Sequence, residues 1–296
     1  MKSICIILTD PDSINEQILL NSFNKLKKSN LKKIYLLGDS KLFPKLFKKI
    51  SKIKKINFFN IKLQQKNYLK YLHNLTDKSL ELFDKKKIQY LINMPLNKKK
   101  FLKNKFLGFT EFISHKIDKK KNENMLLFNK NFSVCPLTTH EQIKNVHKKI
   151  NKKILINAIK NIIFFYKKIL KFKDTKIIVL GLNPHASIDT NKISKDNTCI
   201  KPVVKFFKKK KIDISGPVSA DTAFINTENK VFLGMYHDQV LIPFKMKNKF
   251  NGINITIGKK IIRLSPDHGT GINLKNKTKN IDNTSFIECI KFCEKY

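Results

Sequence analysis

KIIVLGLNPHA, residues 176–186, is the stretch that sets the fold class of this chain. Its first half is an apolar run with the length of a buried strand, and a polar turn that reaches His185 follows at once. Uninterrupted apolar strands are typical of parallel sheets that helices cover on both faces. In such sheets, ligands bind beyond the carboxyl ends of the strands. The stretch therefore predicts an α/β fold and makes His185 a candidate site residue.

The same alternation of strand and helix extends over the whole chain of 296 residues. Further apolar runs of strand length occupy 3–8, 33–37, 89–94, 125–129, 231–236, 253–257 and 260–264. Longer stretches with helical spacing lie between them, at 14–28, 41–53, 67–85, 110–119, 141–171, 199–211 and 283–294. Strands that alternate with helices indicate βαβ units and a largely parallel sheet.

Length and composition are typical of a globular cytoplasmic protein. The chain is long enough for two domains of about 100–150 residues each. No apolar run approaches the roughly 18–20 residues that a membrane span requires, so we expect no membrane partner. The 5 cysteines are scattered and form no Cys-x-x-Cys pair, which indicates a reducing compartment and argues against a disulfide framework.

The formal net charge of +39 is the kind of value found in proteins that bind nucleic acid. However, only one of the 61 basic residues is an arginine, and the lysines are spread along the whole chain. Nucleic-acid readers favour arginine, whose planar fork matches phosphates and guanine edges. Abundant Lys, Asn, Ile and Phe, with 9 Gly and no Trp, indicate an A/T-rich genome instead. We therefore expect no nucleic-acid partner. A non-catalytic basic binding protein or a decayed protein is the alternative of another class.

The single arginine, Arg263, is informative against this background. A codon bias that replaces arginine by lysine leaves arginine only where lysine cannot serve. Arg263 follows Lys245 and Asn254 at intervals of 9 residues. A guanidinium binds a phosphate or a carboxylate through two parallel hydrogen bonds, and a lysine adds a point charge. These three residues are therefore candidates for binding an anionic substrate, although Lys245 also fits an ordinary surface lysine.

Three histidines each follow an apolar strand and enter a polar turn: His140, His185 and His237. Three neutral imidazoles with an open fourth position suit a catalytic zinc or a similar divalent ion. Such an ion polarises a substrate hydroxyl and stabilises the carbonyl that forms. The alternative is a set of hydrogen-bonded structural histidines. Candidates for orienting the ligands or for proton transfer are Asp221, Asp238 and Lys98.

Several common motifs are absent from the sequence. No G-x-G-x-x-G follows the first strand, and the chain has neither a P-loop nor a G-x-S-x-G turn. Glycine spacing therefore predicts no standard Rossmann dinucleotide site and no serine-hydrolase elbow.

Eight short segments resemble, in the same order, those of the 4-hydroxythreonine-4-phosphate dehydrogenase family. Together they extend over about residues 91 to 270, and long strings such as YHDQVLIPFK, residues 236–245, are far more specific than any single motif. The eight segments are Asn93–Lys98, Gly108–Glu111, Leu137–His140, Gly181–Ala186, Gly216–Thr222, Tyr236–Lys245, Asn254–Arg263 and Asp267–Thr270.

The resemblance implies a fold of two α/β/α domains with a cleft between them, like that of the isocitrate and isopropylmalate dehydrogenases. It implies a cofactor-side domain of residues 1–107 plus 265–296. Residues 108–264 would form the domain that binds metal and substrate and that dimerises. It further implies a homodimer with the active site at the subunit interface.

The resemblance also assigns roles to individual residues. His140, His185 and His237 match the family's ligands to one divalent metal ion, with Zn²⁺, Mg²⁺ and Co²⁺ left open. The loop of Asp267, His268, Gly269 and Thr270 would border the cofactor, which is NAD, with NADP left open. The substrate-binding positions are matched by Thr110, Lys245, Asn254 and Arg263.

The implied reaction is the oxidation of 4-phosphohydroxy-L-threonine to 2-amino-3-oxo-4-phosphooxybutanoate. This product loses CO₂ to give 3-amino-2-oxopropyl phosphate, on the route to pyridoxal phosphate, the coenzyme form of vitamin B6. A related dehydrogenase for a phosphorylated hydroxy acid, 4-phospho-threonate or 4-phospho-erythronate, is the alternative within the family.

The sequence departs from the family pattern in ways that bear on substrate and cofactor. Phe109 replaces a histidine that contacts substrate, and Val240 replaces a glycine. The glycines of the family's N-terminal loop are all missing from the corresponding residues 10–16, and Ser187 follows Ala186 where the family has glycine. Loss of glycine where the backbone approaches a ligand usually costs geometry.

Overall fold

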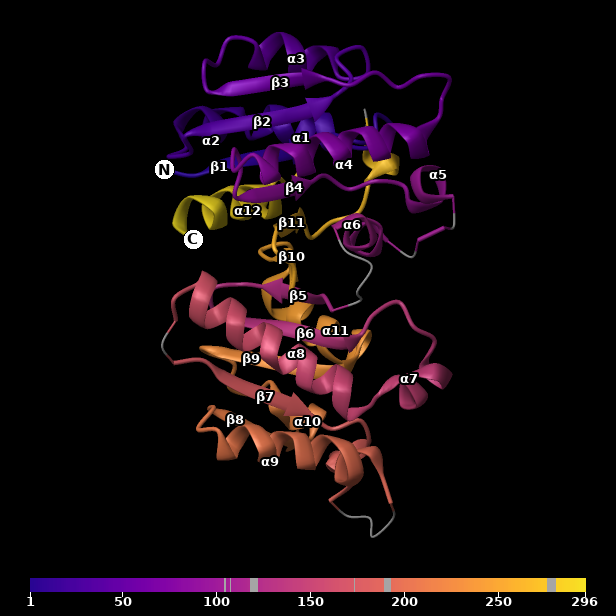
Figure 1. Ribbon diagram of the computed structural model, residues 1–296, viewed down its shortest axis with the longest axis vertical. Helices are drawn as coiled ribbons and strands as arrows, with labels where there is room; N and C mark the ends of the chain where they lie inside the picture. Colours follow the sequence, from indigo (N-terminus) through magenta and orange to yellow (C-terminus); the bar gives the residue numbers. More distant parts are fainter. Residues whose placement is uncertain (104, 107, 118–121, 173, 189–192, 276–280) are drawn as a thin grey trace. The chain divides into compact units, whose positions relative to one another are not determined.

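The computed structural model of the chain describes residues 1–103, 105–106, 108–117, 122–172, 174–188, 193–275 and 281–296 (Figure 1). The chain forms two compact units. The first unit contains Met1–Lys121, Phe250–Asn254 and Lys259–Tyr296. The second contains Asn122–Lys249 and Ile255–Gly258, so strand β10 (Ile253–Ile257) has residues in both.

The first unit is built on parallel strands in the order β3-β2-β1-β4-β11. Apart from the half-buried β3, these strands are buried along almost their whole length, because helices cover both faces of the sheet. Their bounds are β1 (Ser3–Ile7), β2 (Lys33–Gly38), β3 (Ile56–Asn60), β4 (Tyr90–Asn93) and β11 (Ile262–Pro266).

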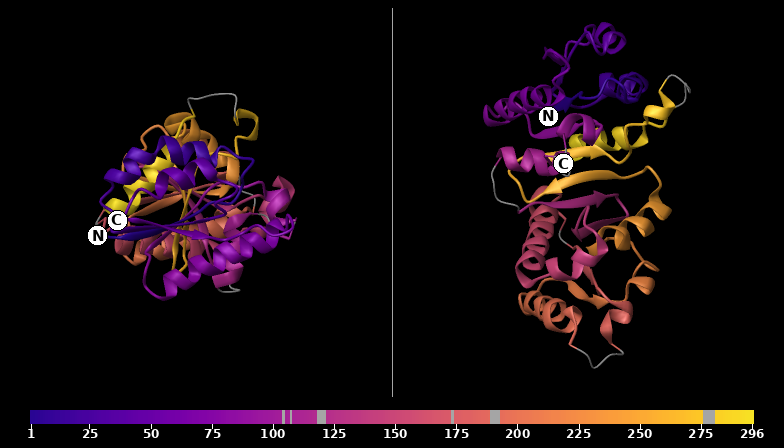
Figure 2. Two further views of the ribbon diagram at one scale, coloured as in Figure 1. Left: turned by 90° about the horizontal axis from the view of Figure 1, so that it is seen from above. Right: turned by 90° about the vertical axis from the view of Figure 1, so that its right-hand side faces the viewer.

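The helices of the first unit lie on opposite sides of its strands, as α4 and α1 show in the right-hand view of Figure 2. Side chains of α4, α5 and α6 pack on alternate strand residues such as Cys5, Tyr35 and Leu91 in one apolar cluster. Asn67 caps α4, because its side chain accepts a hydrogen bond from the Lys70 amide. The helices are α1 (Asn15–Asn21), α2 (Phe23–Lys28), α3 (Pro44–Ile50), α4 (Tyr68–Asp84), α5 (Lys98–Leu102), α6 (Phe109–Ile117) and α12 (Thr284–Lys295).

The second unit contains strands in the order β5-β6-β9-β7-β8. β5 and β6 pair antiparallel, and the other neighbours pair parallel. The carboxyl ends of β6, β9, β7 and β8 therefore lie at one edge of the sheet. The bounds are β5 (Asn124–Phe128), β6 (Phe132–Thr138), β7 (Lys176–Leu180), β8 (Ile214–Val218) and β9 (Lys230–Tyr236).

Helices also cover both faces of the second sheet. In α11, Val240 and Phe244 pack with Phe132 and Phe232 in one apolar cluster, and α8 lies on the other face (Figure 1). α8 continues as a π-helical turn over Phe165–Ile169. The helices are α7 (Ile143–Lys149), α8 (Lys152–Phe164), α9 (Lys201–Lys209), α10 (Ala220–Ala223) and α11 (His237–Asn248).

Every strand expected from an apolar run is present, but the apolar pattern missed β3, β6 and β8. β6 carries Pro136, and in β8, which has the sequence ISGPV, serine, glycine and proline interrupt the apolar run. The helix expected over 141–171 is wrong as a single element. It breaks before α8, where Asn151 caps the new helix by accepting a hydrogen bond from the Ile154 amide.

The two compact units divide the chain at different residues from the expected domains, 1–107 plus 265–296 and 108–264. Phe109 and Phe112 of α6 pack into the core of the first unit, and β11 pairs with β4 there. Thr110 and Arg263 consequently belong to the first unit. The functions expected of the two domains stay predictions.

Across the part of the chain that the structure describes, no helix combines the length and the apolar character that crossing a membrane requires.

Phe112 provides a test of the first unit's core. It is fully buried and makes edge-on contacts with Phe106 and His73, whereas Phe164 of α8 is 58% exposed. Phe112→Ala should lower the free energy of unfolding by about 3–5 kcal/mol, because it leaves a cavity. Phe164→Ala should change it by about 0.5 kcal/mol or less. Urea denaturation measures both, and equal losses would contradict this assignment of the core.

Candidate active site

Two of the predicted metal ligands meet at the carboxyl edge of the second sheet. β6 ends at Thr138 and β9 at Tyr236, and these two residues are register partners. His140 follows β6 after one residue, and His237 begins α11 directly after β9. The two imidazole rings consequently lie close together, with centroids 6.0 Å apart and planes inclined by 35°.

His185 lies beyond the end of β7, at the same edge. It belongs to the turn Pro184–Ser187 and is exposed. Asp221 follows the neighbouring strand β8 and accepts hydrogen bonds from the Ser219 hydroxyl and, at 2.9 Å, from the Thr222 amide. The Ser219 hydroxyl is the main reason that the pKa of Asp221 lies below its usual value, and the nearby His185 adds to the effect. Asp221 therefore lies close enough to His185 to interact with it electrostatically.

Asp238 is suited to the orienting role that the sequence predicts for it. Its Oδ1 lies 2.6 Å from Nδ1 of the neighbouring His237. A carboxylate bonded to one ring nitrogen fixes the tautomer and the orientation of the imidazole, and it directs the other nitrogen toward a ligand.

The described residues form no group of three or more His, Cys, Asp or Glu side chains that can hold a metal ion as they stand. The structure does place the imidazoles of His140 and His237 side by side, and both His140 and His185 have left-handed backbone with φ of 41° and 51°. Strained backbone of this kind is concentrated at functional sites. Imidazole nitrogen is also a preferred ligand of zinc and related ions. The donor chemistry of this edge thus fits a divalent ion, and the set of three ligands stays a prediction.

Arg263 is a buried cation of the first unit. It lies in β11 beside Leu91 of β4, and 4% of its surface is exposed. Its Nε donates a hydrogen bond to Asn93 Oδ1, and a terminal nitrogen donates to Thr110 Oγ1 at 3.1 Å. The Phe109 ring lies under the guanidinium, with 5.4 Å between the guanidinium carbon and the ring centroid. β4, β11 and α6 therefore meet at one guanidinium group.

The guanidinium keeps its charge in this position. Burial lowers the pKa of Arg263 to about 10, and the carboxylate of Glu111 in the first turn of α6 opposes the shift. The group is therefore protonated at neutral pH. A lysine has no planar fork with which to bind Asn93 and Thr110 together, which gives a physical reason for the single arginine.

Asn93 is a further candidate site residue: it begins the family-like segment Asn93–Lys98 but was not among the predicted site residues. It is the last residue of β4, is buried, and accepts the Nε hydrogen bond of Arg263. A polar residue near the end of the apolar run 89–94 was the available signal, because strand ends are where site residues gather in such sheets.

The predicted cofactor-side loop, Asp267–Thr270, follows β11 at the carboxyl edge of the first sheet. The Asp267 amide donates to the Ser285 hydroxyl at 2.7 Å, and the Thr270 carbonyl accepts from the Ile14 amide at 3.0 Å. Gly271 follows with φ of +58°, and a Cβ there would lie 2.6 Å from the Ile14 side chain. The loop thus lies directly against the N-terminal loop.

The N-terminal loop, residues 10–16, lacks the glycines that the resembled family has there. None of residues 10–16 has a positive φ, so the conformation places no demand on glycine. Asp10 is fully buried and accepts hydrogen bonds from the Asp12 amide at 3.1 Å and the Asn97 amide at 3.0 Å. Asp10 therefore joins the loop after β1 to the loop after β4, a role that the sequence analysis missed.

Three further candidates are Lys245, Lys98 and Asn254. Lys245 lies in α11 of the second unit, about 12 Å along the helix from His237. Lys98 is exposed at the start of α5. Asn254 lies in β10, and among the described residues its buried Oδ1 has no hydrogen-bond partner. A buried acceptor without a donor is costly, so the Asn254 Oδ1 is a candidate acceptor for a ligand donor.

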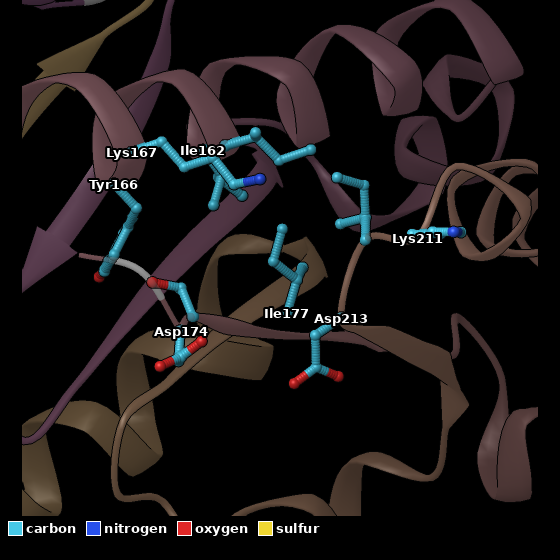
Figure 3. Close-up of a pocket in the computed structure, with 10 residues that line it drawn as sticks. Ile162, Tyr166, Lys167, Asp174, Ile177, Lys211 and Asp213 are labelled. Carbon is cyan, nitrogen blue, oxygen red and sulfur yellow. The ribbon is translucent and has the colours of Figure 1, made fainter. Parts of the chain in front are cut away.

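A separate cavity of about 170 Å³ opens in the second unit (Figure 3). It lies at the amino ends of β7 and β8, where Ile177 and Asp213 line it together with Lys167 of the π-helical turn. His185 lies beyond the opposite end of β7, so this cavity is not part of the candidate site.

Known proteins agree with the resemblance in sequence. The model of the pyridoxal phosphate biosynthetic protein PdxA family matches residues 2–293. A 4-hydroxythreonine-4-phosphate dehydrogenase from Sulfurihydrogenibium sp. (strain YO3AOP1) is 34% identical over an alignment 320 positions long. The alignment covers 98% of this chain and 97% of the relative.

Solved structures agree in fold. A 4-hydroxythreonine-4-phosphate dehydrogenase from Klebsiella pneumoniae superposes with a TM-score of 0.82 at 22% identity, covering 99% of this chain and 97% of that one. An isocitrate dehydrogenase from Methylococcus capsulatus gives a TM-score of 0.53 at 9% identity, covering 98% and 84%. The predicted fold class, α/β and isocitrate dehydrogenase-like, is confirmed.

Because the family model covers nearly the whole chain and the relative is similar over its full length, the chain belongs to the PdxA family of pyridoxal phosphate biosynthetic proteins.

Proposed function

We propose that the protein oxidises 4-phosphohydroxy-L-threonine with NAD and a divalent metal ion, in the biosynthesis of pyridoxal phosphate. The observation that carries the proposal is the pairing of His140 and His237 at one sheet edge, in a chain similar over 98% of its length to a 4-hydroxythreonine-4-phosphate dehydrogenase. The carbon that bears the substrate's secondary hydroxyl would lose a hydride to NAD, and the hydroxyl oxygen would lose its proton to a base. The resulting 3-oxo acid would then lose CO₂ to give 3-amino-2-oxopropyl phosphate.

His140, His185 and His237 would hold the metal ion, for which Zn²⁺, Mg²⁺ and Co²⁺ remain candidates. When bound, the ion supplies a Lewis acid for the substrate oxygen. Asp238 holds the ring of His237 through its 2.6 Å contact. Asp221 is held in its ionised form by the Ser219 hydroxyl, so it suits proton acceptance or electrostatic support of His185.

Arg263 would bind the phosphate or the carboxylate of the substrate, together with Thr110, Lys245 and Asn254. The bonds to Asn93 and Thr110 fix the plane of the guanidinium, and its charge persists at neutral pH. A fixed and charged fork of this kind is what bidentate recognition of an anion requires. The orphaned Oδ1 of Asn254 would accept a hydrogen bond from the substrate.

NAD would lie against the loop of Asp267–Thr270, with NADP as the alternative. Gly269 is exposed, and a Cβ on it would meet no atom within 4 Å, so the loop leaves room for a ligand beside its backbone. The glycine-free N-terminal loop supports Thr270 through the hydrogen bond that the Ile14 amide donates to its carbonyl.

We also propose a homodimer, with the active site at the subunit interface and α11 in the contact. This helix buries Val240 and Phe244 but also exposes Ile242 (57%) and Met246 (78%). Ile225, which is 80% exposed, belongs to a segment joined to α11 by the hydrogen bond from Lys247 to the Phe224 carbonyl. Apolar side chains gathered in this way are typical of a protein interface, and a second copy of the chain is the partner that the family resemblance implies.

A second candidate function is favoured by Phe109. Its ring contacts Arg263 where the resembled family has a histidine that contacts substrate, so the substrate loses a polar neighbour. A phosphorylated hydroxy acid that lacks the amino group, 4-phospho-threonate or 4-phospho-erythronate, would tolerate the change. A preference of about tenfold for such a substrate, worth ~1.4 kcal/mol in kcat/KM, would establish this alternative.

The first prediction concerns the metal. NADH formation from NAD and 4-phosphohydroxy-L-threonine should stop when a chelator is added and return when a divalent ion is restored. His237→Ala should lower kcat/KM by about 100-fold or more, since it removes a ligand of the Lewis acid. His147→Ala, at an exposed histidine of the same unit, should have no effect. Chelator-resistant turnover would contradict the metal dependence.

The second prediction concerns Arg263. Arg263→Lys should lower kcat/KM by a factor that corresponds to about one to three kcal/mol of lost transition-state stabilisation. This is the scale of lost charge-assisted hydrogen bonds. The matched control is the reverse exchange at a nearby exposed position, Lys260→Arg, which should leave kcat/KM unchanged. Steady-state kinetics measures both variants. If kcat/KM is unchanged in Arg263→Lys, a positive charge at this position is sufficient and the planar guanidinium is not required.

The third prediction concerns the dimer. Met246→Glu should shift the solution mass from dimer toward monomer, because it buries a charge in an apolar contact. Phe164→Glu, on the opposite face of the second unit, should leave the mass unchanged. Light scattering coupled to gel filtration measures both. A monomeric unmodified protein, or a dimer indifferent to Met246→Glu, would exclude α11 as the contact.

A further inference from the structure

The turn that carries His185 has an unusual backbone. His185, Ala186 and Ser187 are three consecutive left-handed residues, with φ of 51°, 52° and 57°, and none of them is glycine. The left-handed conformation costs roughly 1–2 kcal/mol for each residue that carries a Cβ. Other contacts must therefore hold the turn in this shape.

One end of the turn is held by close packing. A Cβ on Gly181 would lie 2.7 Å from Ala186, so only glycine permits the turn to fold back on the end of β7. The carbonyl of Gly181 accepts a hydrogen bond at 2.7 Å from the side chain of Gln239, whose own oxygen accepts from the Met235 amide at 2.7 Å. Gln239 thereby links the start of the turn to α11, the helix that begins with His237.

The rest of the turn is held by one carboxylate. Asp196 is fully buried, and its Oδ1 accepts the Leu182 amide at 2.7 Å. Its Oδ2 accepts the Asn183 side chain at 2.7 Å, the Ser187 hydroxyl at 2.8 Å and the Asn183 amide at 3.3 Å. Residues on both sides of His185 are thus bound to the same carboxyl group, which accepts all four of these hydrogen bonds.

We propose that Asp196 is a positioning residue for His185, and that the hydrogen bond from the Ser187 hydroxyl helps Asp196 to hold the left-handed turn. Asp196 is proposed to act on His185 through the turn and not by contact with a substrate or a metal. At residue 187, where the resembled family has glycine, the chain has a serine in a left-handed conformation. The hydrogen bond from Ser187 to Asp196 offsets the strain that its Cβ introduces. The role of His185 itself rests on the proposed function.

The test uses the full-length protein and three substitutions. Asp196→Asn keeps the shape of the side chain but replaces an acceptor oxygen by an amide that also donates, so one or more of the four donors loses its partner. Ser187→Gly removes the hydroxyl and the strain together, and Ser187→Ala removes only the hydroxyl. Asp213→Asn, at an exposed carboxylate of the same unit, is the control for charge.

The first readout is amide hydrogen exchange in the metal-free protein. In Asp196→Asn, exchange in residues 181–188 should rise about tenfold or more, while β6 and β9 stay protected. Ser187→Ala should show a smaller rise, and Ser187→Gly and Asp213→Asn should resemble the unmodified protein. Unchanged exchange in Asp196→Asn, or an equal rise throughout the second unit, would overturn the proposal.

The second readout is Co²⁺ affinity by calorimetry, compared with His185→Ala. Asp196→Asn should weaken Co²⁺ binding about tenfold or more, and Ser187→Gly should leave it within about twofold. If His185→Ala does not weaken Co²⁺ binding, the metal role in the proposed function fails, while the exchange experiment still decides the role of Asp196. If His185→Ala weakens binding and Asp196→Asn does not, the turn needs no carboxylate, and the proposal is wrong.

Discussion

In a parallel sheet with helices on both faces, the faces are covered, so polar functional side chains lie at the ends of the strands. The candidate site follows from this constraint. In the second unit, β6, β9, β7 and β8 end at one edge, which brings His140 to His237 and His185 to Asp221. In the first unit, the ends of β1 and β4 carry Asp10 and Asn93. Arg263 is buried as well, and its hydrogen bonds to Asn93 and Thr110 make the burial of its charge tolerable.

The fold class and the family could be read from the sequence because the decisive strands are buried on both faces, and β1 and β7 are therefore uninterrupted apolar runs. The pattern failed where other forces dominate. β8 carries glycine and proline, and β6 carries Pro136 and yet pairs on both sides. α11 escaped notice because it contains Pro243 and exposes apolar residues as well as burying them, so it lacks the one-sided pattern of a surface helix.

The candidate site was predictable where one residue type in one place implies a chemistry. The histidines after strands and the single arginine are of this kind, and the structure gives Arg263 a set of partners that a lysine could not match. Asn93, Asp10 and Asp196 were missed because their roles depend on contacts with distant parts of the chain. Asp196 bonds residues 9 to 14 positions away, and Asp10 bonds Asn97. No local spacing reports such contacts.

The surviving glycines show which backbone positions the chain could not alter under its codon bias. In residues 10–16 the main chain found a course that any residue can follow, so the glycines could disappear without steric penalty. Their loss even narrows the unfolded ensemble, which lowers the entropy that folding must overcome. Gly181 remains where a single added carbon would collide with Ala186. Mutational drift has thus removed glycine where the backbone does not require it and has kept it where an added Cβ would collide.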